Sequence, residues 1–234
     1  TENMGMRGLQ HGNSVTDEER QHHLQKASEA MADLMDAIGL KDRDASLGGK
    51  LGLAFGARGR AGALAHYEPH NQVINLTRAR GVGSLAHEWG HFFDHALMDF
   101  NISKAATNRP DADFMSERAD EGSRDPMHKA YSNLRESWLN SGFRERLNDY
   151  VREKVREGQM SEGKAKYWQT PREIFARTFE RYVQHKLGQE DRENTYLAGM
   201  RKQSHPLWPT DAEVKEMAPA FDAIFAAYKN RETK

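Results

Sequence analysis

The chain has 234 residues and a formal net charge of −1, with 37% hydrophobic and 29% charged residues, a balance that allows a sizeable core but gives no global electrostatic basis for binding nucleic acid. Because it has no cysteine, it forms neither disulfides nor thiolate metal sites, so a bound zinc ion would need histidine and carboxylate ligands. No run of 18 apolar residues and no signal peptide is visible, so we expect no transmembrane helix, and the lack of cysteine fits a reducing cytoplasm.

The first predicted element is a helix near the N-terminus. Residues 1–15 are glycine-rich and predicted to be irregular. Thr16 and Glu19 then have the spacing of a capping box, and apolar residues follow at helical spacing as far as Ile38. Gly39 is expected to end this helix.

Residues 50–76 have the pattern of a small sheet, mixed or antiparallel. Apolar side chains alternate with small ones from Leu51 to Phe55, which is typical of a strand. Residues 63–67 and 72–76 flank a turn and are expected to form a hairpin.

The segment after this sheet is HEWGH at residues 87–91, which matches the pattern HExxH. Ser84 can cap a helix there, and on that helix His87 and His91 lie one turn apart on the same face. Their imidazoles can converge on one Zn²⁺ at about 2.0–2.1 Å, and Glu88 can act as general base toward a water on the metal. The other side of the helix is apolar and carries Leu85, Trp89, Phe92, Phe93 and Ala96. HExxH also occurs by chance, but the helical context, the apolar back and the preceding strand favour a metal site.

The C-terminal half is predicted to be helical. Residues 99–124 lack periodicity, and we expect a flexible insertion there rather than a lid. Four helices follow, each marked by a cap or an apolar stripe, and they begin near Pro126, Phe143, Pro171 and Thr210. Pro219 is expected to kink or split the last of them.

A catalytic zinc usually has three protein ligands and one open position. The metzincin pattern would require glycine and histidine where this chain has Asp94 and Leu97. His95 lies one turn after His91, but three histidines spaced along one straight helix, at about 1.5 Å per residue, cannot all reach one ion. The third ligand is therefore expected from elsewhere in the chain.

A carboxylate from the helix after Pro171, as in the gluzincins, is the expected third ligand. Glu173 and Glu180 are the two candidates, although Glu173 also fits as a helix cap and Glu180 as an ion-pair partner of Arg177. The segment from Glu173 resembles the ExxAxxF helix of ImmA/IrrE-like peptidases, in which the first glutamate binds zinc. Glu173 is favoured on that resemblance, with Glu180 as the alternative. Asp94 is expected either to orient a ligand imidazole or to be a surface carboxylate.

Several segments together resemble the first type of large polyvalent protein-associated domain. They are residues 7–13, 51–59, 65–69, 73–77, 83–91, 175–180 and 207–210. The resemblance implies a zincin-like domain from multidomain proteins of phages and conjugative elements, which travel with invading DNA to act in the recipient cell. Residues 99–130 are longer than such domains usually have, and Ser14 stands where an aromatic residue is more usual.

The fold expected for 1–234 is one zincin-like metallopeptidase domain, excised from a longer protein. Its class would be α+β, mostly helical, with the small sheet beside the HExxH helix. By analogy with zinc peptidases, the strand Val73-Ile74-Asn75-Leu76 is expected at the sheet edge, where an extended polypeptide adds by main-chain pairing.

The expected activity is zinc-dependent cleavage of a protein in the host or recipient cytosol. Glu88 would take the proton of the attacking water and pass it to the leaving amine. Candidates for the oxyanion partner are Tyr67, Arg177, Tyr182 and His185.

Two other functions stay open. A binding module on a zincin scaffold would hold DNA or a host protein without cleaving it, although the intact HExxH motif argues against this. Its basic patch would consist of Arg58, Arg60, Arg78 and Arg80. A self-processing protease would use residues 99–124 as its lid or cleavage site.

Overall fold

The structure is a computed structural model, and it describes residues 4–13, 15–57, 65–77, 83–99, 113–119, 121–199 and 205–232. The chain divides into two compact units. The first consists of Thr1–Phe93 and Lys186–Met200, and the second of Asp94–His185 and Arg201–Lys234. The described residues are mostly helical with one small mixed sheet, which confirms the predicted α+β class.

The first helix of the chain, α1, spans Asp17–Ala37. The predicted capping box is present, since the Glu19 amide donates to the Thr16 hydroxyl at 3.2 Å and the Thr16 amide donates to the Glu19 carboxylate at 2.9 Å. Gly39 adopts the left-handed region at φ 67°, where its amide donates to the Asp36 carbonyl and ends the helix. Both ends of this helix are therefore set by local sequence.

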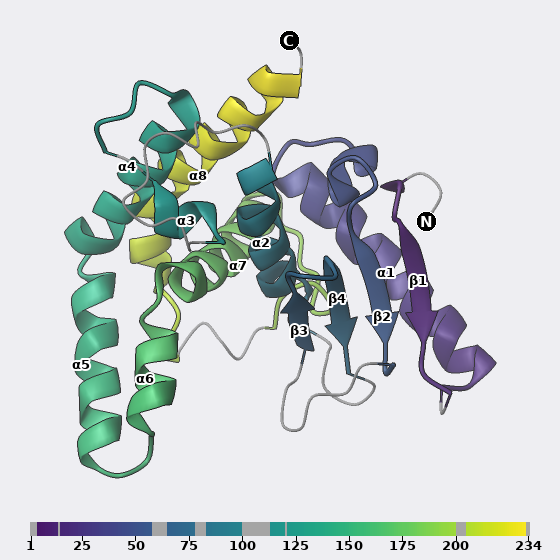
Figure 1. Ribbon diagram of the computed structural model, residues 1–234, viewed down its shortest axis with the longest axis horizontal. Helices are drawn as coiled ribbons and strands as arrows, with labels where there is room; N and C mark the ends of the chain where they lie inside the picture. Colours follow the sequence, from purple (N-terminus) through teal and green to yellow (C-terminus); the bar gives the residue numbers. More distant parts are fainter. Residues whose placement is uncertain are drawn as a thin grey trace. The chain divides into compact units, whose positions relative to one another are not determined.

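The sheet of the first unit has the strand order β1-β2-β4-β3 (Figure 1). Its strands are β1 (Gly8–His11), β2 (Gly52–Phe55), β3 (Ala65–Glu68) and β4 (Val73–Leu76). β1, β2 and β4 are parallel, and β3 pairs antiparallel with β4. The predicted hairpin is thus confirmed, and the sheet is mixed.

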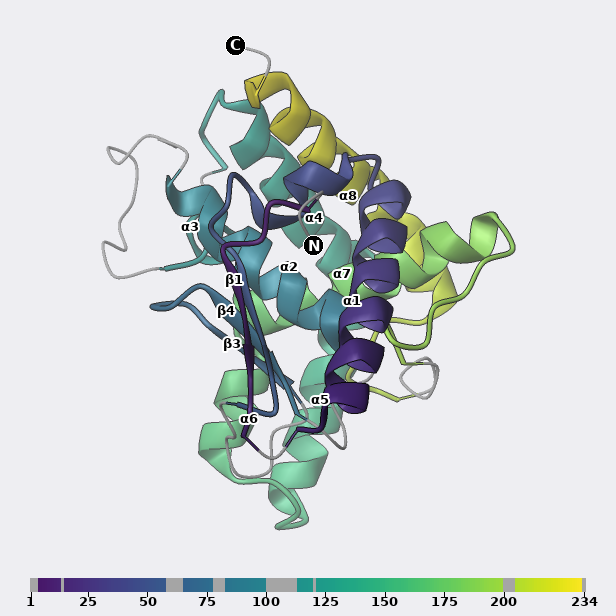
Figure 2. The ribbon, with the colours of Figure 1, turned by 90° about the vertical axis from the view of Figure 1, so that its right-hand side faces the viewer.

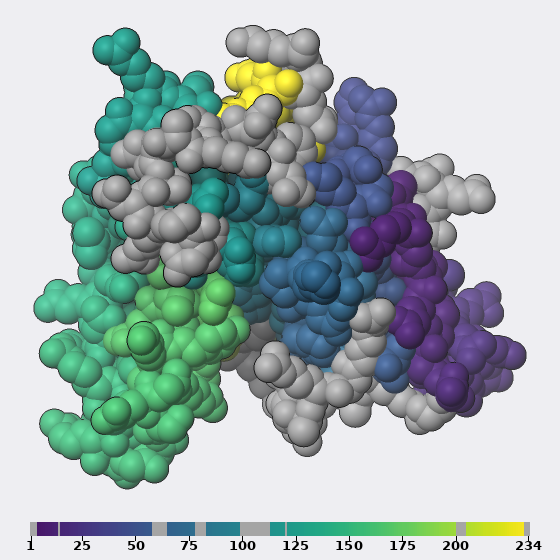
Figure 3. Space-filling view, viewed as in Figure 1, coloured from purple at the N-terminus to yellow at the C-terminus, as the bar shows by residue number. Residues whose placement is uncertain are grey.

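β1 corrects the prediction that the N-terminal residues are irregular. It pairs with β2 from Gly8↔Gly52 to His11↔Phe55, and its atoms are visible at the surface in purple in Figure 3. The chain leaves the strand at Gly12, where an added Cβ would lie 2.2 Å from the Gly56 carbonyl oxygen, so only glycine fits. The glycines that suggested a loop therefore accompany a strand.

α1 and the first part of α2 (Leu85–Ala96) lie on the same face of the sheet (Figure 2). Trp89, Phe92 and Phe93 of α2 are fully buried. The Trp89 indole donates to the Ala45 carbonyl at 2.9 Å, in the short helix η2 (Asp42–Ser46). The Phe92 ring meets Tyr67 of β3 edge-on at 5.9 Å between centroids. The apolar back of the HExxH helix is thereby fixed within the first unit.

The second unit is helical. After η3 (Leu97–Asp99), its helices are α3 (Met115–Arg118), α4 (Pro126–Asn140), α5 (Phe143–Arg156), α6 (Glu162–Trp168), α7 (Pro171–Gln189) and α8 (Asp211–Glu232). The four predicted helix starts are confirmed. α6, capped by Ser161, was not predicted because seven residues are too short to show a period. α8 continues through Pro219, so the proline does not split it.

α7 and α8 carry a cluster of aromatic rings in the core of the second unit. Phe179 stacks on Phe175, and Tyr182 stacks on Phe221 with 4.8 Å between ring centroids. α4 and α8 lie side by side in Figure 1 and contact each other extensively. None of the helices in the described part of the chain has the length and apolarity that crossing a membrane requires.

Candidate metal centre

The first turn of α2 is anchored by backbone hydrogen bonds. Gly83 takes φ 81°, and its amide donates to the Tyr196 carbonyl at 2.9 Å. The Gly199 amide donates back to the Gly83 carbonyl at 3.0 Å, and the Ala86 amide donates to the Leu197 carbonyl at 2.9 Å. The last of these bonds satisfies an amide of the first turn, which the start of a helix otherwise leaves without a partner, and the other two fix Gly83 just before the helix, so the HExxH turn begins at a defined position.

The two histidines of the motif face each other on α2. Their ring centroids are 4.8 Å apart, and the ring planes lie at 83°. His87 is half-buried, while His91 and the neighbouring Glu88 are each only 7% exposed. The spacing i, i+4 on a helix accounts for this closeness. Two imidazoles and one carboxylate are therefore concentrated on one turn.

Glu173 lies in the first turn of α7, in the second unit, and is 4% exposed. Arg177, one turn later, donates from Nη2 to its Oε2 at 3.1 Å, and the Tyr167 hydroxyl donates to Oε1. Burial lowers the pKa of Arg177, whereas the Glu173 charge opposes that shift. The two donors hold the carboxylate in one orientation.

Arg177 is itself fixed by its surroundings. Its Nη1 donates to the Trp168 carbonyl at 3.0 Å, and its guanidinium lies over the Trp168 ring, 5.5 Å from the centroid. The Trp208 ring lies 5.8 Å from the same group. Arg177 was predicted as an oxyanion candidate, and its contacts here are with Glu173, Trp168 and Trp208.

His87, His91 and Glu173 form a group that could hold a metal ion, with one ligand atom from each and all three atoms within 4.8 Å of one another. Among the described residues, no other group of three or more histidine or carboxylate side chains meets that condition. Two imidazole nitrogens and one carboxylate oxygen are ligands that zinc accepts while keeping an open position. The donor set is therefore compatible with zinc.

The other carboxylates considered as ligands or supports have different hydrogen-bond partners. Glu180 is fully buried, and its Oε2 accepts a hydrogen bond from the Trp208 indole at 2.9 Å. Asp94 is also fully buried, and it accepts from the Ser116 amide at 2.8 Å and the Ser116 hydroxyl at 2.6 Å. The alternative of a surface carboxylate at Asp94 is thus wrong, because the side chain ties α3 to the end of α2.

Three further oxyanion candidates differ in how they are held. The Tyr182 hydroxyl donates to Asp222 at 2.6 Å, and the side chain is 1% exposed, so its hydrogen atom is already engaged. Burial also raises the pKa of Tyr182. Tyr67 on β3 and His185 on α7 are both half-buried.

Tyr167 was not predicted as part of the site. It lies on α6, and its side chain is 45% exposed although its hydroxyl reaches Glu173. The only sequence signal was an aromatic residue six positions before the favoured glutamate, which is too common to identify a partner.

The predicted position of Val73-Ile74-Asn75-Leu76 at the sheet edge is wrong. This strand is β4, and it pairs with β2 on one side and β3 on the other. Its main chain therefore has no open side for an added peptide. The analogy with zinc peptidases concerned the strand that precedes the HExxH helix in the chain. It could not predict the order of the strands in the sheet, because that order depends on how distant segments pair.

Two other sequence-based sites lie partly or wholly beyond the described residues. Arg58, Arg60, Arg78 and Arg80, the predicted basic patch, all lie outside them. Of the predicted insertion at 99–124, residues 100–112 and 120 lie outside them, whereas 115–118 form α3.

Comparison with known families gives a match in the C-terminal part of the chain. Residues 160–232 match the family model described as Large polyvalent protein-associated domain 1. This confirms the predicted resemblance over the segment that includes Glu173, and the HExxH turn lies outside it. Neither the curated proteins nor the solved structures give a significant match.

Proposed function

We propose, from the premise that residues 160–232 match Large polyvalent protein-associated domain 1, that this chain is a zinc-dependent endopeptidase of a phage or other mobile genetic element. The observation that carries the proposal is the group formed by His87, His91 and Glu173, with Glu88 next to the first ligand. Such a domain in a mobile element would act on a polypeptide of the host or recipient cell, in the cytosol.

The residues divide into ligands and a base. His87, His91 and Glu173 would hold the ion, which leaves one position for water or substrate. Bound zinc would supply Lewis acidity, since it lowers the pKa of water and polarises a carbonyl. His87 and His91 are four residues apart and lie on one face of the helix, whereas Glu88 lies to the side of that face. Glu88 is therefore not expected to be a metal ligand, and it suits proton transfer.

Glu88 would accept the proton of the attacking water and deliver it to the leaving amine of the cleaved peptide bond. Its side chain is 7% exposed, which limits competition from bulk water. Since the backbone of this turn is anchored by the 196–199 segment, the main chain of Glu88 keeps a defined position relative to that of His87. A general base needs such a fixed distance to its proton.

Tyr167 and Arg177 would act by positioning Glu173. Outer partners of a ligating carboxylate typically change metal affinity by about 10–100-fold when they are mutated. The buried ion pair at 3.1 Å and the tyrosine hydrogen bond occupy both carboxylate oxygens on the protein side. They favour one rotamer of Glu173 before an ion arrives.

The test is a comparison of wild type with Glu88→Gln, using Glu162→Gln, an exposed position on α6, as the matched control. Zinc content is measured by mass spectrometry of the purified proteins, and new protein N-termini are mapped in bacterial cells expressing each variant. We expect Glu88→Gln to keep zinc and produce no new N-termini, while the control behaves as wild type. An unchanged set of cleavages in the Glu88→Gln cells would rule out the assigned base.

A further inference from the structure

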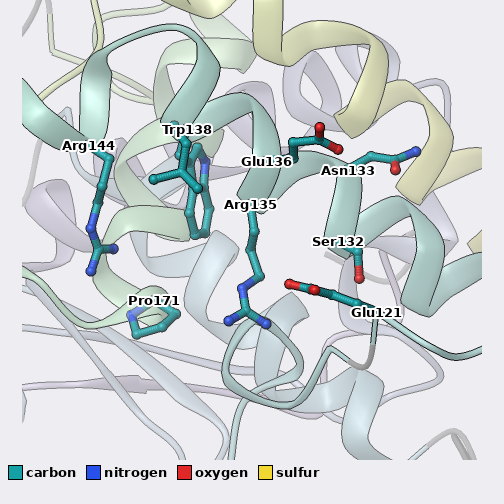
Figure 4. A pocket seen from close by; sticks show the side chains of 9 residues that line it. Glu121, Ser132, Asn133, Arg135, Glu136, Trp138, Arg144 and Pro171 are labelled. Atoms are coloured by element: carbon teal, nitrogen blue, oxygen red, sulfur yellow. The ribbon is translucent and has the colours of Figure 1, made fainter.

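A separate pocket of about 640 Å³ lies in the second unit (Figure 4). Side chains of α4, among them Ser132, Arg135 and Trp138, line it together with Arg144 of α5. It shares no residue with the candidate metal centre. Its volume is within the range of small-ligand sites, about 300–1,000 Å³.

Two guanidinium groups, those of Arg135 and Arg144, line this pocket. Arg144 is half-buried and, among the described residues, makes no hydrogen bond or ion pair. Arg135 donates to the Ala119 carbonyl at 3.1 Å but has no acidic partner in the described part of the chain. Burial lowers the pKa of Arg144, and the charge of Arg135 lowers it further. Two like charges in a partly dry site are costly, and an anion between them would relieve that cost.

Two polar groups of the pocket also lack partners. Trp138 is 3% exposed, and its indole Nε1 has no hydrogen-bond acceptor. The Ser132 hydroxyl is buried without a partner as well. A buried donor without an acceptor is rare and costs about 1–3 kcal/mol, so each such group calls for an explanation. Both atoms have almost no accessible surface, so acceptor oxygens of a bound chain would satisfy them once neighbouring side chains move aside.

The remaining charges in the pocket indicate what kind of anion fits. Glu121 and Glu136 also line it. Figure 4 shows the Glu136 side chain extending in the opposite direction to Arg135, whereas Glu121 lies nearer the arginine. Their negative charges disfavour a dianion such as phosphate and leave room for one carboxylate. Leu139, 66% exposed, adds an apolar surface beside the charged groups.

We propose that this pocket is a docking site for a polypeptide partner, in which Arg135 and Arg144 bind one acidic side chain and Trp138 and Leu139 contact the apolar residue next to it. Arginine suits this role because its planar fork matches a carboxylate and forms paired hydrogen bonds. The indole N–H of Trp138 would donate to the same ligand.

The protein provides its own probe for a test. It has four tryptophans, so the indole signals of the other three serve as internal controls in a nitrogen–proton correlation spectrum. The full chain, labelled with ¹⁵N, is titrated with acetyl-Gly-Leu-Glu-Leu-Gly-amide and with the same peptide carrying glutamine for glutamate. Trp138→Phe assigns the signal. We expect the glutamate peptide to move the Trp138 signal and the glutamine peptide to leave it in place.

Variants identify the charges responsible. Arg144→Gln should weaken peptide binding about tenfold by removing a charge-assisted hydrogen bond, and Arg144→Lys should weaken it less. Arg156→Gln, an exposed change of the same kind on α5, should bind as wild type. A Trp138 signal that stays in place with both peptides, or equal binding by wild type and Arg144→Gln, would overturn the proposal. Tighter binding of a phosphoserine peptide than of the glutamate peptide would overturn the choice of a carboxylate.

Discussion

Replacing Arg177 with methionine should destabilise the protein more than the same replacement of Arg181, one turn later on α7. Both arginines are 2% exposed. Their anionic partners differ, because the Glu173 side chain is 5% exposed and that of Asp211 is 79% exposed. Once the arginine is removed, water can solvate Asp211 but not Glu173.

The structure allows the size of the difference to be worked out. Removing one partner of a buried ion pair costs about 3–5 kcal/mol, because the remaining charge is left without compensation. We expect a loss of about 4 kcal/mol for Arg177→Met, since the Trp168 carbonyl also loses its donor. For Arg181→Met the main loss is the hydrogen bond to the Pro209 carbonyl, for which we expect about 2 kcal/mol.

The assay is urea denaturation with a chelator present, so that no metal contributes to the free energy of unfolding. Glu173→Leu/Arg177→Met removes both charges and should lie within about 1 kcal/mol of wild type. Equal losses for the two single variants, or a double variant as unstable as Arg177→Met, would refute the reasoning that burial of the partner sets the cost.

Three further predictions concern carboxylates and tyrosines. Glu173→Gln should lose zinc during dialysis, whereas Glu180→Gln should keep it; metal analysis checks both, and the opposite result would make Glu180 the third ligand. Tyr182→Phe should lose about 1 kcal/mol of stability with the hydrogen bond to Asp222 while leaving substrate cleavage unchanged, and a large fall in turnover would restore Tyr182 as a catalytic residue. Burial raises the pKa of Tyr131 and Tyr182, so the folded state retains their protons above the ordinary value of about 10 and stability should fall as pH rises past about 10. Urea midpoints measured across that range should decline less steeply for Tyr182→Phe than for wild type.

Local signals predicted the parts of this fold that depend on neighbouring residues. The caps at Thr16 and Asp125 act within a few residues, and both are present as predicted. The HExxH helix follows from an apolar stripe on one side and polar residues on the other, a pattern that a helix alone satisfies. The roles of the motif's residues in chemistry stay predictions.

Features that depend on distant segments could not be read from the sequence. β1 is a strand because β2, far along the chain, provides its parallel partner, and Gly-Leu-Gln-His has no alternation to reveal that. The same limit explains why β4 was expected at an edge. The candidate carboxylates could be named from the sequence. Their hydrogen bonds could not, because the Ser116 hydroxyl that donates to Asp94 and the Trp208 indole that donates to Glu180 are brought there by tertiary packing.

Trp89 gives the motif an optical reporter of its own. It stands between Glu88 and Gly90, is fully buried, and is the only tryptophan of the first unit, since Trp138, Trp168 and Trp208 belong to the second. A chain with phenylalanine at those three positions would emit from this one indole alone. Its emission wavelength depends on the hydrogen bond to the Ala45 carbonyl and on the buried stacking contact with the Phe93 ring. Fluorescence would then follow the order of the HExxH turn during unfolding or metal uptake, without any attached dye.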